Sequence, residues 1–153
     1  MRFAYVQPFV ESARKVLSQA VSGRIVAGDL KLSSAAIPSR GVTAIVGVTG
    51  EGEGRVIFDM DTETALRIAS AMNGEPFGEL DELAKDTLSE LAGMMTGNAI
   101  SVLNDGGHCL KVSPPTLFAG ENVSISGKAL EALVVPLETP FGEVAVNVAI
   151  ATS

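Results

Sequence analysis

The stretch Leu80–Leu103, LDELAKDTLSELAGMMTGNAISVL, contains no proline and carries apolar residues three or four positions apart. This spacing predicts a long amphipathic helix that turns one side toward a core. The apolar stripe consists of Leu80, Ala84, Leu88, Leu91, Met95, Ala99 and Val102. We therefore expect the core of the protein to lie between this helix and a sheet.

The opposite face of the same helix is polar and thinly covered. At ~100° per residue, Asp86, Glu90, Gly93 and Gly97 fall within about 60° of one another. A glycine inside a helix costs about 1 kcal/mol relative to alanine, so the pair indicates either close approach of another molecule or drift. Asp86 and Glu90 are surface neighbours, which suits paired acid–base chemistry, although a solvated acidic face is commoner.

Composition excludes several classes of protein. The 153 residues suit a single domain, 1–153, and a hydrophobic content of 46% excludes a disordered chain. No apolar run reaches the ~18 residues of a membrane span, and the start lacks a secretory pattern. One cysteine, Cys109, fits a reducing compartment, so we expect a cytoplasmic protein. A net charge of −7 without a basic cluster argues against nucleic acid as a partner.

The remaining patterns predict an α+β fold. Two further helices are expected, one ending near Val21 and one running from Asp61 or Thr62 to about Met72. The expected strands are Arg24–Ser33, Gly41–Thr49, Arg55–Asp59, Cys109–Val112, Val123–Ser126, Leu130–Leu137 and Glu143–Ala151. The order favours a largely antiparallel sheet with helices packed on one face. It also suggests two similar helix-plus-sheet halves, which begin near Gln7 and Leu80.

Two local motifs resemble sites but lack the necessary residues. Gly50, Gly52 and Gly54 are not followed by the Gly-Lys-Ser/Thr of a phosphate loop, so a hairpin turn is predicted. His108 and Cys109 are the only histidine and cysteine, whereas a zinc site needs three or four ligands. A Cys–His nucleophile pair is conceivable, but neighbours along a strand point to opposite faces.

The segment LDELAKDTLSELAGMMTGNA, followed by KVSPPTLFAG, resembles the CheX branch of the CheC/CheX/FliY family of chemotaxis phosphatases. Members carry a helix with Asp or Ser, three residues, Glu, two residues and Asn, and a later proline-containing segment. Asp86 matches the first position, Glu90 the glutamate, and Pro114 and Pro115 the proline segment. The stretch GVTAIVGVTGEGEGRVIFDMDTETALRIASAMNG also looks like the hairpin and following helix of the family.

This resemblance implies a function and a partner. Family members remove phosphate from the aspartate of a CheY-type response regulator. The glutamate, here Glu90, is held to contact a lysine of the regulator, while the asparagine positions the attacking water. The Mg²⁺ ion belongs to the regulator, so no cofactor of its own is expected. Relatives pair through their sheets, which implies a homodimer, and the last two apolar strands would offer an edge that needs covering. The alternative is that a helix or loop of the same chain covers that edge.

The asparagine position of the signature is occupied by Gly93. Asn98 lies eight residues beyond Glu90, ~12 Å along the helix and about 80° around it, so it does not simply replace the amide. The partner-binding residues implied are Asp86, Glu90, Gly93 and Gly97. Three functions remain open. The first is an aspartyl-phosphate phosphatase of CheX type, or a descendant of one with much reduced activity. The second is a module that binds the receiver domain of the regulator without hydrolysis, and the third is a structural partner in a chemotaxis or flagellar assembly.

Overall fold

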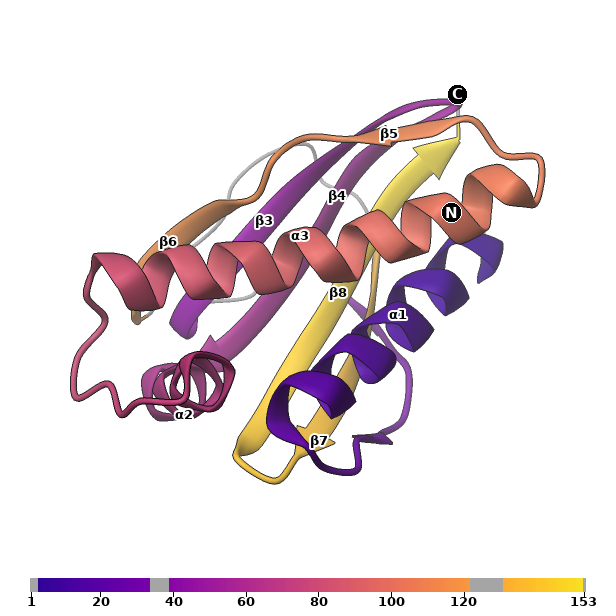
Figure 1. The fold of residues 1–153 in the computed structure, drawn as a ribbon. Coiled ribbons are helices and arrows are strands. Elements are labelled where there is room, and N and C mark those ends of the chain that lie inside the picture. Colours follow the sequence, from indigo (N-terminus) through magenta and orange to yellow (C-terminus); the bar gives the residue numbers. More distant parts are fainter. Residues whose placement is uncertain (1–2, 34–38, 122–130, 153) are drawn as a thin grey trace.

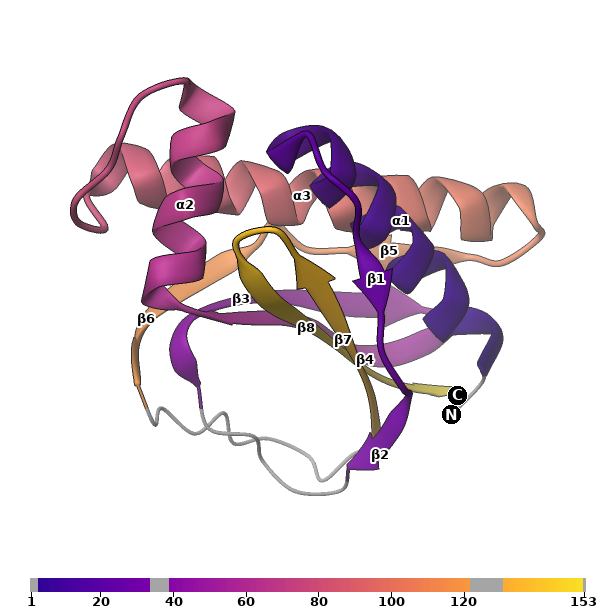
Figure 2. The same cartoon turned by 90° about the horizontal axis from the view of Figure 1, so that it is seen from below.

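Three helices cover one face of an eight-stranded antiparallel sheet, as the sequence predicts (Figure 1 and Figure 2). The computed structural model describes residues 3–33, 39–121 and 131–152. The elements are α1 (Phe3–Val21), β1 (Val26–Ala27), β2 (Lys31–Ser33), β3 (Arg40–Gly50), β4 (Gly52–Asp61), α2 (Thr62–Asn73), α3 (Glu82–Asp105), β5 (Leu110–Val112), β6 (Thr116–Glu121), β7 (Ala132–Thr139) and β8 (Gly142–Thr152). The strand expected at Val123–Ser126 lies outside the described residues, and β6 instead follows the two prolines directly.

The sheet confirms the two halves and shows how they interlock. The strand order is β1-β7-β8-β4-β3-β5, with β2 also paired to β7 and β6 also paired to β3. The long hairpins β3–β4 and β7–β8 meet in the centre, where Val56 lies opposite Val148. The short strands cross over, since β1 and β2 pair with the hairpin of the second half, and β5 and β6 pair with that of the first. Each half therefore completes the sheet edge of the other.

The central hairpin is longer than the sequence suggests. The predicted turn spans Gly50 to Gly54, but β4 already begins at Gly52. Gly54 belongs to the strand because β4 and β8 approach closely there, and a Cβ atom on it would lie 1.8 Å from the carbonyl oxygen of Ala149. From the sequence alone, a glycine needed for close approach of two strands cannot be told from a glycine in a turn, so the predicted turn is too long.

The exposed edge expected at the last two strands is not present. β8 lies between β4 and β7, and the other side of β7 pairs with β1 and β2. The same chain therefore covers this edge, but it does so with the two short strands β1 and β2 and not with the helix or loop that the sequence analysis considered. Exposed apolar side chains occur instead around β1 and β2, at Val26, Leu30 and Leu32.

The core lies between the sheet and the apolar sides of the helices, as predicted. The Asp61 side chain caps α2 by accepting a hydrogen bond from the Thr64 backbone N–H at 2.7 Å. Leu91 of α3 is 1% exposed, in line with the predicted stripe. No helix in the described part of the chain is long and apolar enough to cross a membrane.

The predicted stripe is wrong at its C-terminal end. At the other end Leu80 packs against the core as predicted, but it precedes the helix, which starts at Glu82 after the cap residue Asp81. Val102 is 60% exposed, and Leu103 is buried in its place. The reason is that the last turn of α3 packs against β5, which is not visible in the local periodicity.

Candidate functional site: the outer face of α3

Contacts with the two other helices fix the rotation of α3. Near its start, the Asn73 amide of α2 donates a hydrogen bond to Thr87 Oγ1 at 2.6 Å. Near its middle, Ser12 Oγ of α1 donates to the Met95 carbonyl oxygen at 2.6 Å. Figure 1 shows α3 crossing the sheet with α2 at one end and α1 alongside the other half. The side of α3 that faces away from these contacts is therefore held in one orientation.

Asp86 and Glu90 lie on this outward side and are both exposed. Within the described residues, neither carboxylate has a salt bridge or a side-chain hydrogen bond; the ion pair found on α3 joins Lys85 Nζ to Glu82 Oε1 at 3.8 Å. Both predicted acids are thus available to a cation from another molecule. A carboxylate with no neighbouring base or nucleophile is suited to binding rather than to catalysis by this chain alone.

Gly93 and Gly97 leave the helix backbone uncovered next to Glu90. A Cβ atom at Gly93 would lie 3.8 Å from Pro115 Cγ, which is an ordinary contact, and one at Gly97 would meet no atom of the described residues within 4 Å. Neither glycine is therefore required by the packing of this chain. The bare surface is available for close approach of a partner.

The fold brings the downstream proline segment to the same place. Pro115 lies beside Gly93, because the segment between β5 and β6 passes along α3. The two parts of the sequence signature are therefore neighbours in space. Asn98 is exposed on α3, further along the helix.

Two apolar residues of this face did not stand out in the sequence. Leu83 is 48% exposed and Met94 is 43% exposed. The available signal was that both interrupt the polar side of the helical pattern. We use the term outer face of α3 for the set Leu83, Asp86, Glu90, Gly93, Met94 and Gly97.

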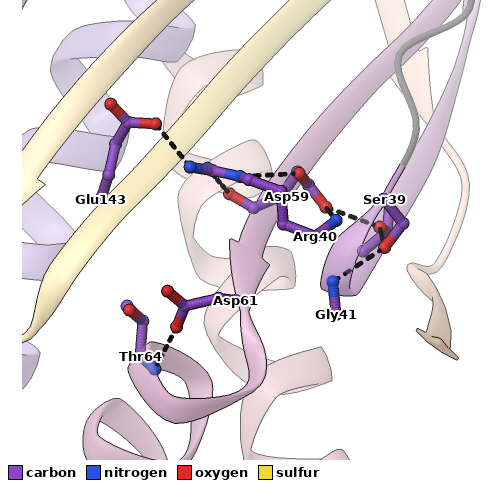
Figure 3. A network of polar contacts seen from close by, with 8 residues as sticks. Ser39, Arg40, Gly41, Asp59, Asp61, Thr64 and Glu143 are labelled. Carbon is purple, nitrogen blue, oxygen red and sulfur yellow. Dashed lines mark hydrogen bonds and ion pairs between the residues drawn. The ribbon is translucent and has the colours of Figure 1, made fainter. Parts of the chain in front are cut away.

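A polar network at the start of β3 has a structural role (Figure 3). Asp59 is buried, and its Oδ1 accepts a hydrogen bond from Thr43 Oγ1 at 2.8 Å. Its Oδ2 accepts from Arg40 Nε at 3.2 Å, and the same guanidinium reaches Glu143 Oε2 at 2.7 Å. Figure 3 shows these side chains converging from β3, β4 and β8. Both carboxylate oxygens of Asp59 accept hydrogen bonds from side chains of the same chain. The network therefore stabilises the packing of the strands and is not a ligand-binding site.

A second polar cluster joins α1, the central hairpin and the loop after α3. Glu51 accepts hydrogen bonds from Tyr5 Oη at 2.7 Å and from the Cys109 backbone N–H, and it lies 3.2 Å from His108 Nδ1. These bonds, that of Tyr5 most, lower the pKa of Glu51 to about 2. An open pocket of ≈ 510 Å³ lies beside the cluster. Sequence reasoning missed it because its members are far apart along the chain.

The cluster does not form a nucleophile pair. In the described structure His108 Nδ1 faces Glu51, and no hydrogen bond joins the exposed Cys109 thiol to the imidazole ring. Among all the residues that the structure describes, no group of three or more His, Cys, Asp and Glu residues could hold a metal ion. The outer face of α3 therefore remains the candidate site.

Comparison with known proteins points to one family. A family model described as chemotaxis phosphatase CheX matches residues 42–138. The CheY-P phosphatase CheX of Thermotoga maritima is 38% identical over 90 residues, which are 58% of this chain and 57% of that protein. The match thus spans little more than half the length of this curated relative.

Solved structures match over nearly the whole chain. A chain in the CheX–CheY–BeF3–Mg²⁺ complex from Borrelia burgdorferi is 36% identical, with a TM-score of 0.82 and coverage of 98% of this chain and 99% of that one. A CheC-like superfamily protein from Shewanella sp. PV-4 gives a TM-score of 0.88 at 24% identity, covering 98% and 99% of the two chains. The second similarity shows the fold alone.

Proposed function

The chain belongs to the CheX family of chemotaxis phosphatases, and from this premise we propose that it binds a phosphorylated CheY-type response regulator through the outer face of α3. The reaction promoted there is hydrolysis of the aspartyl phosphate of the regulator. The observation that carries the proposal is Glu90, an exposed carboxylate without a salt bridge in the described structure, at the family glutamate position of a fixed helix. The complex of the Borrelia burgdorferi neighbour with CheY supports the choice of partner.

Glu90 would act by binding and orientation. In the hydrolysis a water oxygen attacks phosphorus, the bond from phosphorus to the aspartate oxygen breaks, and inorganic phosphate and free aspartate result. Phosphoryl transfer depends mainly on positioning and charge stabilisation, so a partner protein can accelerate it without a nucleophile of its own. Glu90 would pair with the regulator lysine beside the phosphoaspartate. The Mg²⁺ ion would be held by the regulator, and this chain would contribute no cofactor.

Gly93 favours a second candidate function. A glycine has no side chain to hold the attacking water, and a Cβ atom at this position would make only an ordinary contact with Pro115. The loss of one positioning group lowers the rate by about 10²-fold or more. A module that binds the phosphorylated regulator but hydrolyses it slowly therefore accounts for Glu90 and Gly93 together. A structural role in a chemotaxis or flagellar assembly would use the same surface.

One experiment separates these functions. A CheY-type regulator from the same organism is phosphorylated with a radiolabelled donor, and loss of label is followed with and without this chain. A CheX protein that carries the asparagine serves as the positive control. Faster loss with the natural chain, absent in Glu90→Ala, supports the phosphatase. Binding without faster loss supports the module, and absence of any binding contradicts the proposal.

The proposal includes a homodimer in the cytoplasm. The apolar side chains Val26, Leu30 and Leu32 are exposed around β1 and β2, and a second copy could cover them. Light scattering at micromolar concentration measures the mass directly. A monomeric mass would contradict the dimer while leaving the proposed regulator binding intact.

A further inference from the structure

Two large apolar side chains lie near Glu90 on the helix surface, and neither has a role in the proposed hydrolysis. Leu83 and Met94 are 48% and 43% exposed on α3. At ~100° per residue, Leu83, Glu90 and Met94 fall within about 40° of one line along the helix. At ~1.5 Å per residue, Leu83 lies ~10 Å before Glu90 and Met94 ~6 Å beyond it. The acid is therefore bracketed by apolar groups.

An ion pair alone would hold a partner weakly. An exposed pair between a carboxylate and a lysine changes affinity by about fivefold at most, because water and salt screen it. The same pair becomes stronger when surrounding apolar groups exclude water from it. Single exposed apolar residues are common on protein surfaces, but here two of them are aligned with the acid on either side. The bare backbone at Gly93 and Gly97 leaves room for a partner to reach both.

We propose that Leu83 and Met94 are the apolar anchors that hold the regulator on α3 and shield the pair made by Glu90. This inference rests on the proposed function and names residues that decide affinity for the same partner. The occupant is a receiver domain that presents a cationic side chain between two apolar patches ~16 Å apart. The two free carboxylates make the centre of the face complementary to such a cation. The flexible thioether of Met94 suits a surface that adapts to a partner.

The chain supplies a matched control. Val102 is also apolar, lies on the same helix and is 60% exposed, which is more than either anchor. It lies ~18 Å beyond Glu90 and about 120° around the helix from it. If the regulator binds at the position of Glu90, and not to any exposed apolar residue, Val102 will lie outside the interface.

The test measures binding of the full chain to a CheY-type regulator from the same organism, loaded with beryllium fluoride and Mg²⁺, at low and high salt. Met94→Gln and Leu83→Gln keep the side chains long and helix-compatible while making them polar. We expect each to weaken binding about three- to tenfold at both salt concentrations, because the lost contact is apolar. Val102→Thr should change affinity less than twofold, and Met94→Leu, which keeps the side chain apolar, should bind like the natural chain. Glu90→Gln should also weaken binding at both salt concentrations, because salt screens a shielded ion pair only weakly.

The outcomes distinguish this inference from the proposed function. If the natural chain binds and both glutamine variants bind equally well, the anchors are refuted while the regulator remains the partner. If the natural chain does not bind, both proposals fail. If the variants alter the mass of the protein in light scattering rather than its affinity for the regulator, the face serves self-association and the anchors are refuted. Circular dichroism melting confirms that each variant is folded.

Discussion

Replacing Gly93 with asparagine is the sharpest perturbation that this structure offers. The substitution Gly93→Asn returns an amide to the face that carries Glu90, one helical turn further on. The added Cβ atom would lie 3.8 Å from Pro115 Cγ, so the helix can accept it without displacement of the proline segment. The first atom of the new side chain therefore fits without a steric clash.

The expected gain in rate is far larger than the expected gain in stability. Asparagine has a slightly better helix propensity than glycine, which should raise the free energy of unfolding by only a few tenths of a kcal/mol. A positioned amide that orients the attacking water lowers the activation free energy by about 3 kcal/mol, or 10²-fold in rate. The two effects can be separated because they differ by about an order of magnitude.

Gly97→Asn is the matched control for helix propensity, and because Gly97 belongs to the outer face of α3, rates are compared at concentrations at which each variant is saturated with the regulator. Gly97 lies on the same face, and a Cβ atom there would meet nothing within 4 Å in the described part of the chain, so the change in helix propensity should be the same. It stands ~10 Å beyond Glu90, too far to serve the same water. In the assay, loss of phosphate from a radiolabelled regulator should be accelerated by Gly93→Asn alone. Equal rates for the natural chain and both variants would refute the view that the missing amide at Gly93 limits the rate of hydrolysis.

Three further predictions concern stability. Leu91→Ala should lower the free energy of unfolding by ~2–5 kcal/mol through a cavity in the core, whereas Glu90→Ala should change it by less than about 0.5 kcal/mol, as urea titration will show. Asp61→Ala should lower the free energy of unfolding by ~0.5–2 kcal/mol in the same titration, because it removes the cap of α2. An unchanged free energy of unfolding would contradict the capping role. The pKa of Glu51 is about 2 in the folded state, against an ordinary value of 4.5. The ionised Glu51 side chain therefore stabilises the folded protein fully above pH 4.5, and this stabilisation is lost as the pH falls toward 2. Glu51→Gln should flatten this part of the melting temperature profile, and an unchanged profile would exclude Glu51 as its source.

Local periodicity was sufficient to predict the face of α3 that carries the site. Glu90 and Leu91 are adjacent in sequence, yet the helical angle between them correctly separates the exposed acid from the buried leucine. The pattern failed at Val102, because the burial of the last turn depends on β5, which is a different part of the chain.

Contacts between distant residues could not be predicted from one sequence. Tyr5 and His108 meet at Glu51 across separations of 46 and 57 residues, and no local pattern records such a pairing. The position of Pro115 beside Gly93 likewise depends on how β6 pairs with β3. The resemblance to a family indicated that the prolines matter, but only the structure shows which glycine they adjoin.

The exchange of short strands between the two hairpins has a consequence for how the chain can be divided. A cut in the loop before α3 would give one fragment that carries β1 and β2 and another that carries β7, which those strands must cover. Each fragment alone would expose an unpaired strand edge, and such an edge promotes aggregation. Mixed together, the fragments have complementary edges and can reassemble by pairing β4 with β8 in the centre. The single chain is in this sense a covalently joined pair of half-molecules, and each half depends on the other to complete its sheet edge.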